Sequence, residues 1–272
     1  MTGFLARQQR FDAVGSTNDV VRDWLADGTP EVCLAVADEQ TAGRGRAGRT
    51  WVAPRGAALL LSLGFRPAWL EPQRAWRLAA ISALAMADAA EEVAGLPDGA
   101  IRLKWPNDLV VEEGPDPVGG VRKLAGLLGE TEGLGTHDPR VVVGLGINAD
   151  WPAADFPVEI ARSMTSLREA SHGRPIDLAL LLDAFLGRIE ARVEALRGGR
   201  FDVADWQARQ VTTGRIVRLE RPDGGETVRA LGVDVSTGAL IVEDEAVSNG
   251  ERPVLVGEIS HVRLTAPAGS VV

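Results

Sequence analysis

The stretch Gly43-Arg44-Gly45-Arg46-Ala47-Gly48-Arg49-Thr50-Trp51 constrains this sequence more than any other. Its first seven residues hold three glycines and three arginines. Glycine lets a backbone bend and approach a ligand closely, and arginine supplies a charged fork that binds phosphates and carboxylates. We therefore expect a loop that closes over an anionic small molecule. The alternative is a solvated basic loop or a patch that binds nucleic acid.

Both flanks of this loop read as buried strands. Residues 31–37 (EVCLAVA) precede it and residues 57–65 (AALLLSLGF) follow it, and both runs are apolar and of strand length. The loop thus joins two strands of a sheet, which is a common position for loops that close over ligands.

Hydrophobic periodicity predicts three helices and further strands in the same domain. A Ser-Thr-Asn-Asp cap at 16–19 begins a helix that closes at Gly28, Pro72 opens an alanine-rich helix that stops at Gly95, and Asp177 caps a long helix. Strands are expected at 101–105, 109–111, 123–130 and 141–147, with a Gly/Pro/Asp loop at 113–120.

The pattern changes near residue 212, where short strands and tight turns begin. Strands are expected at 215–220, 226–235, 239–242 and 253–264, separated by turns at 222–225 and 236–238. This spacing is typical of a small β-barrel. We predict an α+β protein with a larger domain over 1–212 and a small β domain over 213–272.

Composition excludes several classes of protein. The net charge of −9 argues against general binding of nucleic acid or DNA, which needs an excess of positive charge. Cys33 is the one cysteine, so neither an internal disulfide nor a cysteine metal site is possible, and the three scattered histidines support no metal cluster. Without a signal peptide or an apolar run of membrane length, we expect a cytoplasmic protein with no membrane contact.

Three short motifs place polar groups at strand ends. Residues 104–108 (KWPND) set an amide and a carboxylate at a turn, and they read either as an ordinary hairpin corner or as side chains entering a site. In 122–130 a lysine enters an apolar strand, where it either extends to solvent at the strand end or is buried beside an anion. Gly126 in the same strand marks the close approach of a ligand or another backbone. Residues 144–149 (GLGINA) imitate a dinucleotide fingerprint, but Pro152 prevents the helix which that fingerprint requires.

Taken in order, these motifs resemble those of biotin protein ligases, over nearly the whole chain. The motifs that carry the resemblance are Ser16-Thr17-Asn18, Gln40, 43–51, 104–108, 123–126, 144–148 and Gly257-Glu258-Ile259-Ser260. The resemblance implies a catalytic domain related to class II aminoacyl-tRNA synthetases and lipoate ligases, with a mixed, largely antiparallel sheet, followed by a small SH3-like β-barrel. The chain departs from some members in two ways: the residues before Ser16 leave no room for a helix-turn-helix, and Ala47 replaces an arginine.

The resemblance also implies a two-step reaction and a set of site residues. Biotin and ATP would form biotinyl-5′-AMP, and the biotin would then pass to a lysine of an acceptor protein. The implied catalytic residues are Lys123, Arg46 and Asp108, although Asp108 reads equally well as a turn cap. The implied biotin-binding residues are Ser16, Thr17, Asn18, Gln40, Gly43, Arg44, Arg46, Lys123 and Gly126. The implied adenylate-binding residues are Arg49, Trp51, Asn107, Lys123 and Asn148, and Trp51 has core packing as its alternative.

Partners follow from the same resemblance. ATP is expected with Mg²⁺ bound to the triphosphate rather than to a protein site, and biotin is the substrate. The acceptor would be the biotin carboxyl carrier domain of acetyl-CoA carboxylase or of a related carboxylase, and the chain a monomer or weak homodimer. Two other functions remain open: a lipoate or octanoyl ligase or transferase of the same fold, and a non-enzymatic protein that binds nucleotides or RNA.

Overall fold

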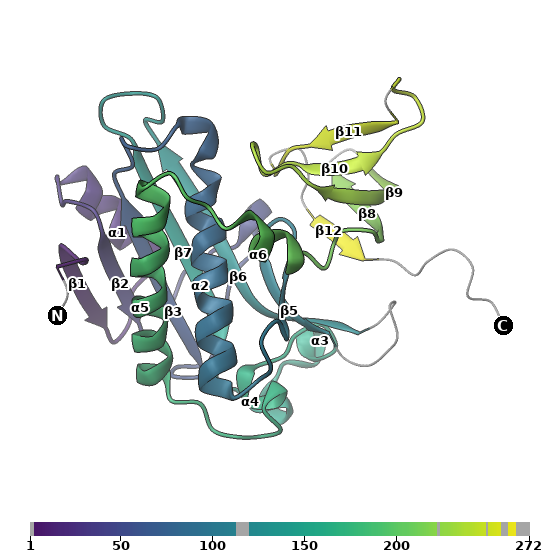
Figure 1. Cartoon of the computed structure of the whole chain (residues 1–272). Helices are drawn as coiled ribbons and strands as arrows, with labels where there is room; N and C mark the ends of the chain where they lie inside the picture. Colours follow the sequence, from purple (N-terminus) through teal and green to yellow (C-terminus); the bar gives the residue numbers. More distant parts are fainter. Residues whose placement is uncertain (1–2, 113–119, 222–223, 249, 257–260, 265–272) are drawn as a thin grey trace.

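A central β-sheet organises the computed structural model, which describes residues 3–112, 120–221, 224–248, 250–256 and 261–264. In these residues seven strands lie in the order β1-β2-β3-β7-β6-β5-β4 (Figure 1). β1 and β2 are parallel and all other neighbours are antiparallel, which confirms the mixed, largely antiparallel sheet. The bounds are β1 Arg7–Phe11, β2 Cys33–Ala37, β3 Ala58–Phe65, β4 Ile101–Lys104, β5 Asp108–Glu112, β6 Val121–Glu132 and β7 Arg140–Asn148.

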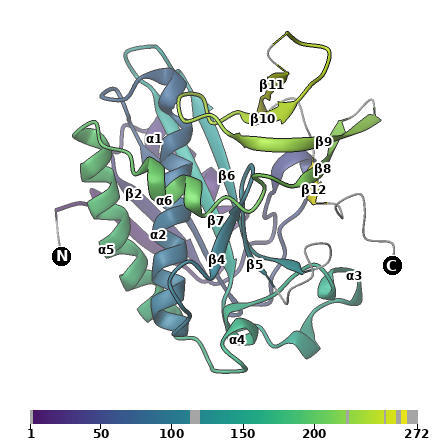
Figure 2. The same cartoon turned by 45° about the vertical axis from the view of Figure 1, so that its right-hand side comes forward.

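Helices cover both faces of this sheet (Figures 1 and 2). α2 (Trp76–Ala94) and α5 (Leu178–Arg197) pack together over one face, and α1 (Thr17–Ala26) lies on the other. β2 shows the division, because its side chains alternate: Leu34 and Val36 join the core under α2 and α5, whereas Cys33 and Ala35 pack against α1. The shorter helices are α3 Val158–Ala161, α4 Leu167–Ala170 and α6 Val203–Ala208, with 3₁₀ turns at Arg46–Gly48, Pro72–Arg74 and Ala153–Asp155.

The helix ends agree with the sequence in most places. The Asp177 carboxylate accepts hydrogen bonds from two backbone N–H groups at the start of α5, and Gly95 ends α2 in a left-handed conformation. The expected start of α2 at Pro72 is wrong, because Pro72 opens a 3₁₀ turn and α2 begins at Trp76. Ser16 occupies the cap position of α1 but makes no side-chain capping bond.

A second sheet follows, with five antiparallel strands in the order β11-β10-β9-β8-β12. The expectation of one strand over 253–264 is wrong, because that stretch holds two strands at opposite edges of the sheet. Closure into a barrel is not seen in the described residues, where β11 and β12 do not pair. The expected motif at 257–260, the turn residues 222–223 and the loop residues 113–119 lie outside the described residues. The bounds are β8 Ile216–Arg221, β9 Gly224–Val233, β10 Leu240–Glu243, β11 Glu251–Val254 and β12 His261–Leu264.

The turn between β9 and β10 is closed by hydrogen bonds to one carboxylate. One carboxylate oxygen of Asp234 accepts hydrogen bonds from the backbone N–H and the hydroxyl of both Ser236 and Thr237. These hydroxyl groups lower the pKa of Asp234. The ionised carboxylate therefore stabilises this turn.

This turn docks the second sheet onto aromatic side chains of the first domain. The indole N–H of Trp105 donates to the carbonyl oxygen of Gly238 (2.9 Å), and that of Trp76 donates to Ser236 (3.3 Å). Trp76 in turn packs against Phe201 and Trp206. The C-terminal sheet is thus fixed beside the ends of β4 and α2. Among the helices of the described residues, none is long and apolar enough to cross a membrane.

Replacing Gly238 with Ala tests this docking against a matched control, Gly250→Ala. Both glycines have a left-handed φ (+73° and +74°), so both variants carry the same backbone strain. Only at Gly238 does an added Cβ meet a neighbour, 2.8 Å from Cδ2 of Trp76. We expect G238A to lower the free energy of unfolding by about 1–3 kcal/mol more than G250A, measured by urea denaturation. Equal losses in the two variants would contradict the docking contact.

Candidate active site

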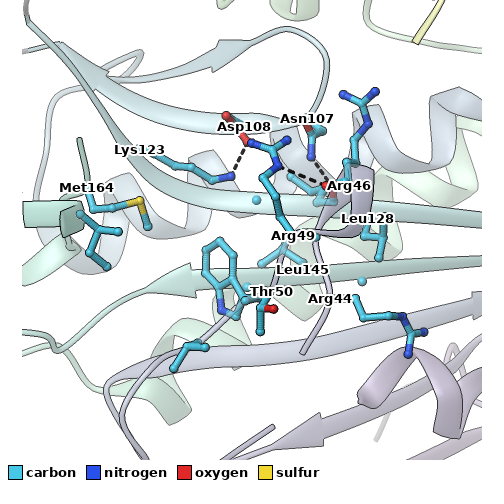
Figure 3. A pocket seen from close by; sticks show the side chains of 18 of the residues that line it. Arg44, Arg46, Arg49, Thr50, Asn107, Asp108, Lys123, Leu128, Leu145 and Met164 are labelled. Carbon is cyan, nitrogen blue, oxygen red and sulfur yellow. Dashed lines mark hydrogen bonds and ion pairs between the residues drawn. The ribbon is translucent and has the colours of Figure 1, made fainter. Parts of the chain in front are cut away.

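A cavity of about 640 Å³ lies between the start of α1, the 43–51 loop and the ends of β4, β5 and β6. Figure 3 shows Asp108, Lys123 and Arg49 around it, with Met164 at one side. Most of the residues that the sequence singled out line it: Ser16, Thr17, Asn18, Gln40, Arg44, Arg46, Arg49, Trp51, Asn107, Asp108, Lys123 and Gly126. Residues far apart in the chain therefore meet at one site.

Two glycines of β7 make room for the side chains that shape the cavity. A Cβ on Gly144 would lie 2.1 Å from Oδ1 of Asn18, and a Cβ on Gly146 would lie 2.7 Å from the indole of Trp51. Both distances are far below van der Waals contact. The Gly-Leu-Gly run therefore lets Asn18 and Trp51 lie directly on the sheet, which is a packing role rather than a dinucleotide fingerprint.

One end of the cavity carries a chain of uncharged hydrogen-bonding groups. The backbone N–H and the hydroxyl of Thr17 both donate to Oε1 of Gln40, at 2.8 and 3.0 Å. The Ser62 hydroxyl lies 2.7 Å from the Thr17 hydroxyl and 2.6 Å from Oδ1 of Asn18. Hydroxyl and amide groups can both donate and accept, so this end suits a ligand with a polar, uncharged head.

An ionic cluster fixes the beginning of the 43–51 loop next to that chain. Arg44 donates to both carboxylate oxygens of Asp19 (2.7 and 2.8 Å) and lies 3.3 Å from the Glu130 carboxylate. The hydrogen bond from Arg44 lowers the pKa of Asp19. Glu130 also accepts a 2.8 Å hydrogen bond from the amide nitrogen of Asn18. Arg44 is therefore an anchor of the loop.

The opposite end of the cavity centres on the carboxylate of Asp108. Nζ of Lys123 lies 2.6 Å from one of its oxygens and Nζ of Lys104 lies 3.7 Å from the other, as Figure 3 shows for Lys123. A register shift between β5 and β6 brings Lys123 and Gly126 to the same face, although they are three positions apart in the strand. Gly126 leaves the space: a Cβ there would lie 3.0 Å from Nζ of Lys123.

Opposing effects act on the pKa of Lys104 beside Asp108. The side chain of Lys104 is only 13% exposed, and burial lowers its pKa while the Asp108 charge acts in the opposite direction. The neighbouring charge of Lys123 lowers the same pKa further. Asp108 is thus the anion that makes two close cations tolerable here.

The second part of the loop reaches toward the C-terminal sheet. Arg46 donates a 2.7 Å hydrogen bond to the carbonyl oxygen of Val256, and Nε of Arg49 donates to the carbonyl oxygen of Arg46. Burial, followed by the Arg49 charge, lowers the pKa of Arg46. Ala47 adopts a left-handed conformation between them (φ 54°), which a side chain disfavours by about 1–2 kcal/mol.

No group of three or more His, Cys, Asp or Glu side chains that could hold a metal ion occurs in the described ranges. The strongest local charges at the cavity are instead the cations of the loop and of β4 and β6. Such a site suits an anion more than a metal ion.

The chain is similar to known proteins over most of its length. A model of the biotin/lipoate A/B protein ligase family matches residues 11–148. The chain is 32% identical to the biotin--[acetyl-CoA-carboxylase] ligase of Mycobacterium tuberculosis, over 94% of this chain and 90% of that protein. It is 31% identical to the bifunctional ligase/repressor BirA of Bacillus subtilis, over 85% of this chain and 68% of that protein.

The chain belongs to the biotin/lipoate A/B protein ligase family. A solved structure agrees: the biotin protein ligase from Aquifex aeolicus, in complex with biotin and ATP, superposes with a TM-score of 0.75 at 26% identity. That match covers 95% of this chain and 99% of the other. The resemblance read from the sequence motifs is confirmed.

Two residues that this family resemblance assigned to the ligands do not line the cavity. Asn148 is fully buried, and its amide nitrogen donates to the carbonyl oxygen of Thr165 (2.9 Å), while its own oxygen has no partner in the described residues. Gly43 lies at the base of the loop and borders a second cavity of about 1280 Å³. A Cβ on Gly43 would lie 2.4 Å from the carbonyl oxygen of Trp51, so the tight loop itself requires this glycine.

Sequence reasoning missed several residues of this ligase site. Ser62 and Glu130 lie behind the lining, within strands read from their apolar runs, and both hold the side chain of Asn18, which lines the cavity. The polar serine in the apolar run 57–65 was the available signal. Lys104 and Arg263 line the cavity as well, Arg263 from β12 of the C-terminal sheet. No local pattern marks Arg263, because only the tertiary docking brings β12 to the cavity.

The variant Lys104→Met tests whether the pKa of Lys104 is lowered in the folded chain. The pKa of Lys104 in the fold is below its ordinary value of 10.5, so between these two values the unfolded chain binds more protons and stability rises with pH. We expect K104M to be more stable than the unaltered chain at neutral pH, with a gain that shrinks as pH approaches 10.5. The control is Arg102→Met, on the same strand. Its free energy of unfolding should differ from that of the unaltered chain by an amount that does not depend on pH in this range. A constant gain for K104M would contradict this pKa shift.

Proposed function

We propose that this chain is an ATP-dependent biotin protein ligase. It would join biotin and ATP to biotinyl-5′-AMP with release of pyrophosphate, and then transfer biotin to a lysine of a biotin carboxyl carrier domain of acetyl-CoA carboxylase or a related carboxylase. The observation that carries this proposal is a single cavity with an uncharged hydrogen-bonding chain at one end and Lys123, Asp108 and the loop arginines at the other.

Biotin fits this polarity. Its ureido ring offers one acceptor and two N–H donors, and the hydroxyl and amide groups of Ser16, Thr17, Asn18 and Gln40 can serve both kinds of group. Arg44, anchored by Asp19, would keep the loop backbone near the ring. Gly126 would leave room for the ligand beside Lys123.

The first step requires charge to be neutralised at the α-phosphate. The biotin carboxylate attacks the phosphorus, the P–O bond to pyrophosphate breaks, and pyrophosphate leaves with the electron pair. Lys123 would bind both anions and stabilise the charge that develops between them. Arg46 would act from the loop and retain the reactive anhydride away from water.

The nucleotide would occupy the part of the cavity around Trp51, Arg49 and Asn107. Asn107 holds the carbonyl oxygen of Leu127 through a 2.7 Å hydrogen bond and so orders the wall of the cavity. Asn148 would act indirectly, because it binds the segment around Thr165 that follows the cavity residue Met164. Mg²⁺ would arrive with the triphosphate, which supplies its oxygen ligands.

In the second step the acceptor lysine attacks the acyl carbon of biotinyl-5′-AMP, and AMP leaves. Asp108 would orient the incoming amine, since its carboxylate already binds ammonium groups at 2.6 and 3.7 Å. We further propose a catalytic domain over 1–212 and an SH3-like domain over 213–272, which would bring Arg263 to the cavity.

A lipoate or octanoyl ligase is the second candidate, because the family model includes both kinds of enzyme. Lipoate has an acyl chain and a dithiolane ring without N–H groups. It could not pair with the hydrogen-bonding capacity that Thr17 and Gln40 keep beyond their bonds to each other, and polar groups left unpaired disfavour a ligand strongly. The polar end of the cavity therefore favours biotin.

Incubation with ATP and radiolabelled biotin or lipoate tests the function and the part of Lys123. We expect an adenylate with biotin only, and Lys123→Gln should slow its formation by about 10²–10³-fold, as the loss of one transition-state donor does in other enzymes. Arg122→Gln, the neighbouring position on β6, is the control and should retain most of the rate. Adenylate formation from lipoate, or equal rates for K123Q and R122Q, would overturn these assignments.

A further inference from the structure

The chain is almost free of lysine. Among its 29 lysines and arginines, Lys104 and Lys123 are the only lysines. Both line the same cavity, and both amines lie beside the same carboxylate, that of Asp108. All other cationic side chains of this kind are guanidinium groups, which remain charged and are not nucleophiles at physiological pH.

This arrangement matters if the cavity produces an acyl adenylate, as proposed above. A mixed anhydride reacts with neutral amines, and a protonated amine has no lone pair with which to attack. The two lysines are the side-chain amines nearest to such an intermediate, since they line the cavity that would hold it. An enzyme of this kind therefore has to keep both amines charged while the intermediate waits for its acceptor.

We propose that Asp108 protects the enzyme from acylating its own Lys104 by holding that amine in the protonated form. The inference rests on the proposed function. Its geometric basis is the pair of contacts to the two carboxylate oxygens, at 2.6 Å from Lys123 and 3.7 Å from Lys104. Asp108 itself is only 10% exposed, so its charge is weakly screened by solvent.

Lys104 is the more vulnerable of the two amines. Its contact with Asp108 is longer, and its other charged neighbours are the cations Lys123, Arg49 and Arg263, which together with burial favour the neutral amine. Asp108 is the one anion that opposes them in this set. Without that charge, the Lys104 amine would become a nucleophile inside the cavity.

The side reaction is an ordinary acyl transfer. The Nζ lone pair of Lys104 attacks the acyl carbon of biotinyl-5′-AMP, and a C–N bond forms. The bond between the acyl carbon and the phosphate oxygen breaks, AMP leaves with the electron pair, and the extra proton on nitrogen passes to water. The product is a biotinyl amide on Lys104.

Chemically prepared biotinyl-5′-AMP tests the proposal without the first reaction step. The unaltered chain and the variants Asp108→Asn and Glu132→Gln are incubated with it in the absence of acceptor, and peptide mass spectrometry locates the biotin. We expect faster labelling of Lys104 in D108N, by about tenfold for each unit by which the amine pKa falls. E132Q, which removes an exposed carboxylate of β6, should behave as the unaltered chain, and Lys104→Arg in the D108N background should abolish the label.

Equal labelling of Lys104 in D108N and in the unaltered chain, at equal occupancy by the adenylate, would overturn the proposal. A pH series on the unaltered chain gives a second test that does not depend on the folding of D108N: labelling of Lys104 should rise with pH and precede that of Lys123. A rate independent of pH, or earlier labelling of Lys123, would also overturn it. Failure of the unaltered chain to make adenylate from biotin and ATP would instead refute the proposed function.

Discussion

The contact on which this site depends is the one between the Asp108 carboxylate and the two lysine amines. Two cations that close together, one of them on a side chain only 13% exposed, are tolerable because an anion lies between them. That geometry needs the register shift between β5 and β6 and the missing side chain at Gly126. The register shift, the glycine and the ion pairs therefore depend on one another.

The rest of the cavity is built on the same sheet face by removal of side chains. Gly144 admits Asn18 and Gly146 admits Trp51, so polar and aromatic groups lie where apolar side chains would otherwise pack. The docked turn between β9 and β10 holds the C-terminal sheet against the first domain. There the carbonyl oxygen of Val256 accepts a hydrogen bond from Arg46. The loop therefore contacts α1 through Arg44 and Asp19, and it contacts the C-terminal segment through Arg46 and Val256, which lie 210 residues apart in the chain.

The sequence predicted what local patterns encode. The apolar strands on either side of the basic loop, the Asp177 cap and the Gly95 stop follow from hydrophobic runs and capping chemistry, and the motif order identified the family. Features that depend on tertiary partners were missed. β1 is a polar, mostly exposed strand that exists because it pairs with β2, and the 253–264 run divides between two edges of a sheet. Ser62 and Glu130 gain their importance through tertiary contacts, both with Asn18, Ser62 also with Thr17 and Glu130 also with Arg44.

The central claim is that one cavity holds the uncharged ring of biotin at its Thr17 end and the reacting phosphate at its Lys123 end. A crystal structure of the chain with biotinyl-5′-AMP tests it most directly. The account predicts the ureido ring within hydrogen-bond distance of Thr17 and Gln40, and the phosphate within that distance of Nζ of Lys123. A ligand bound in the reverse orientation, or outside this cavity, would contradict it.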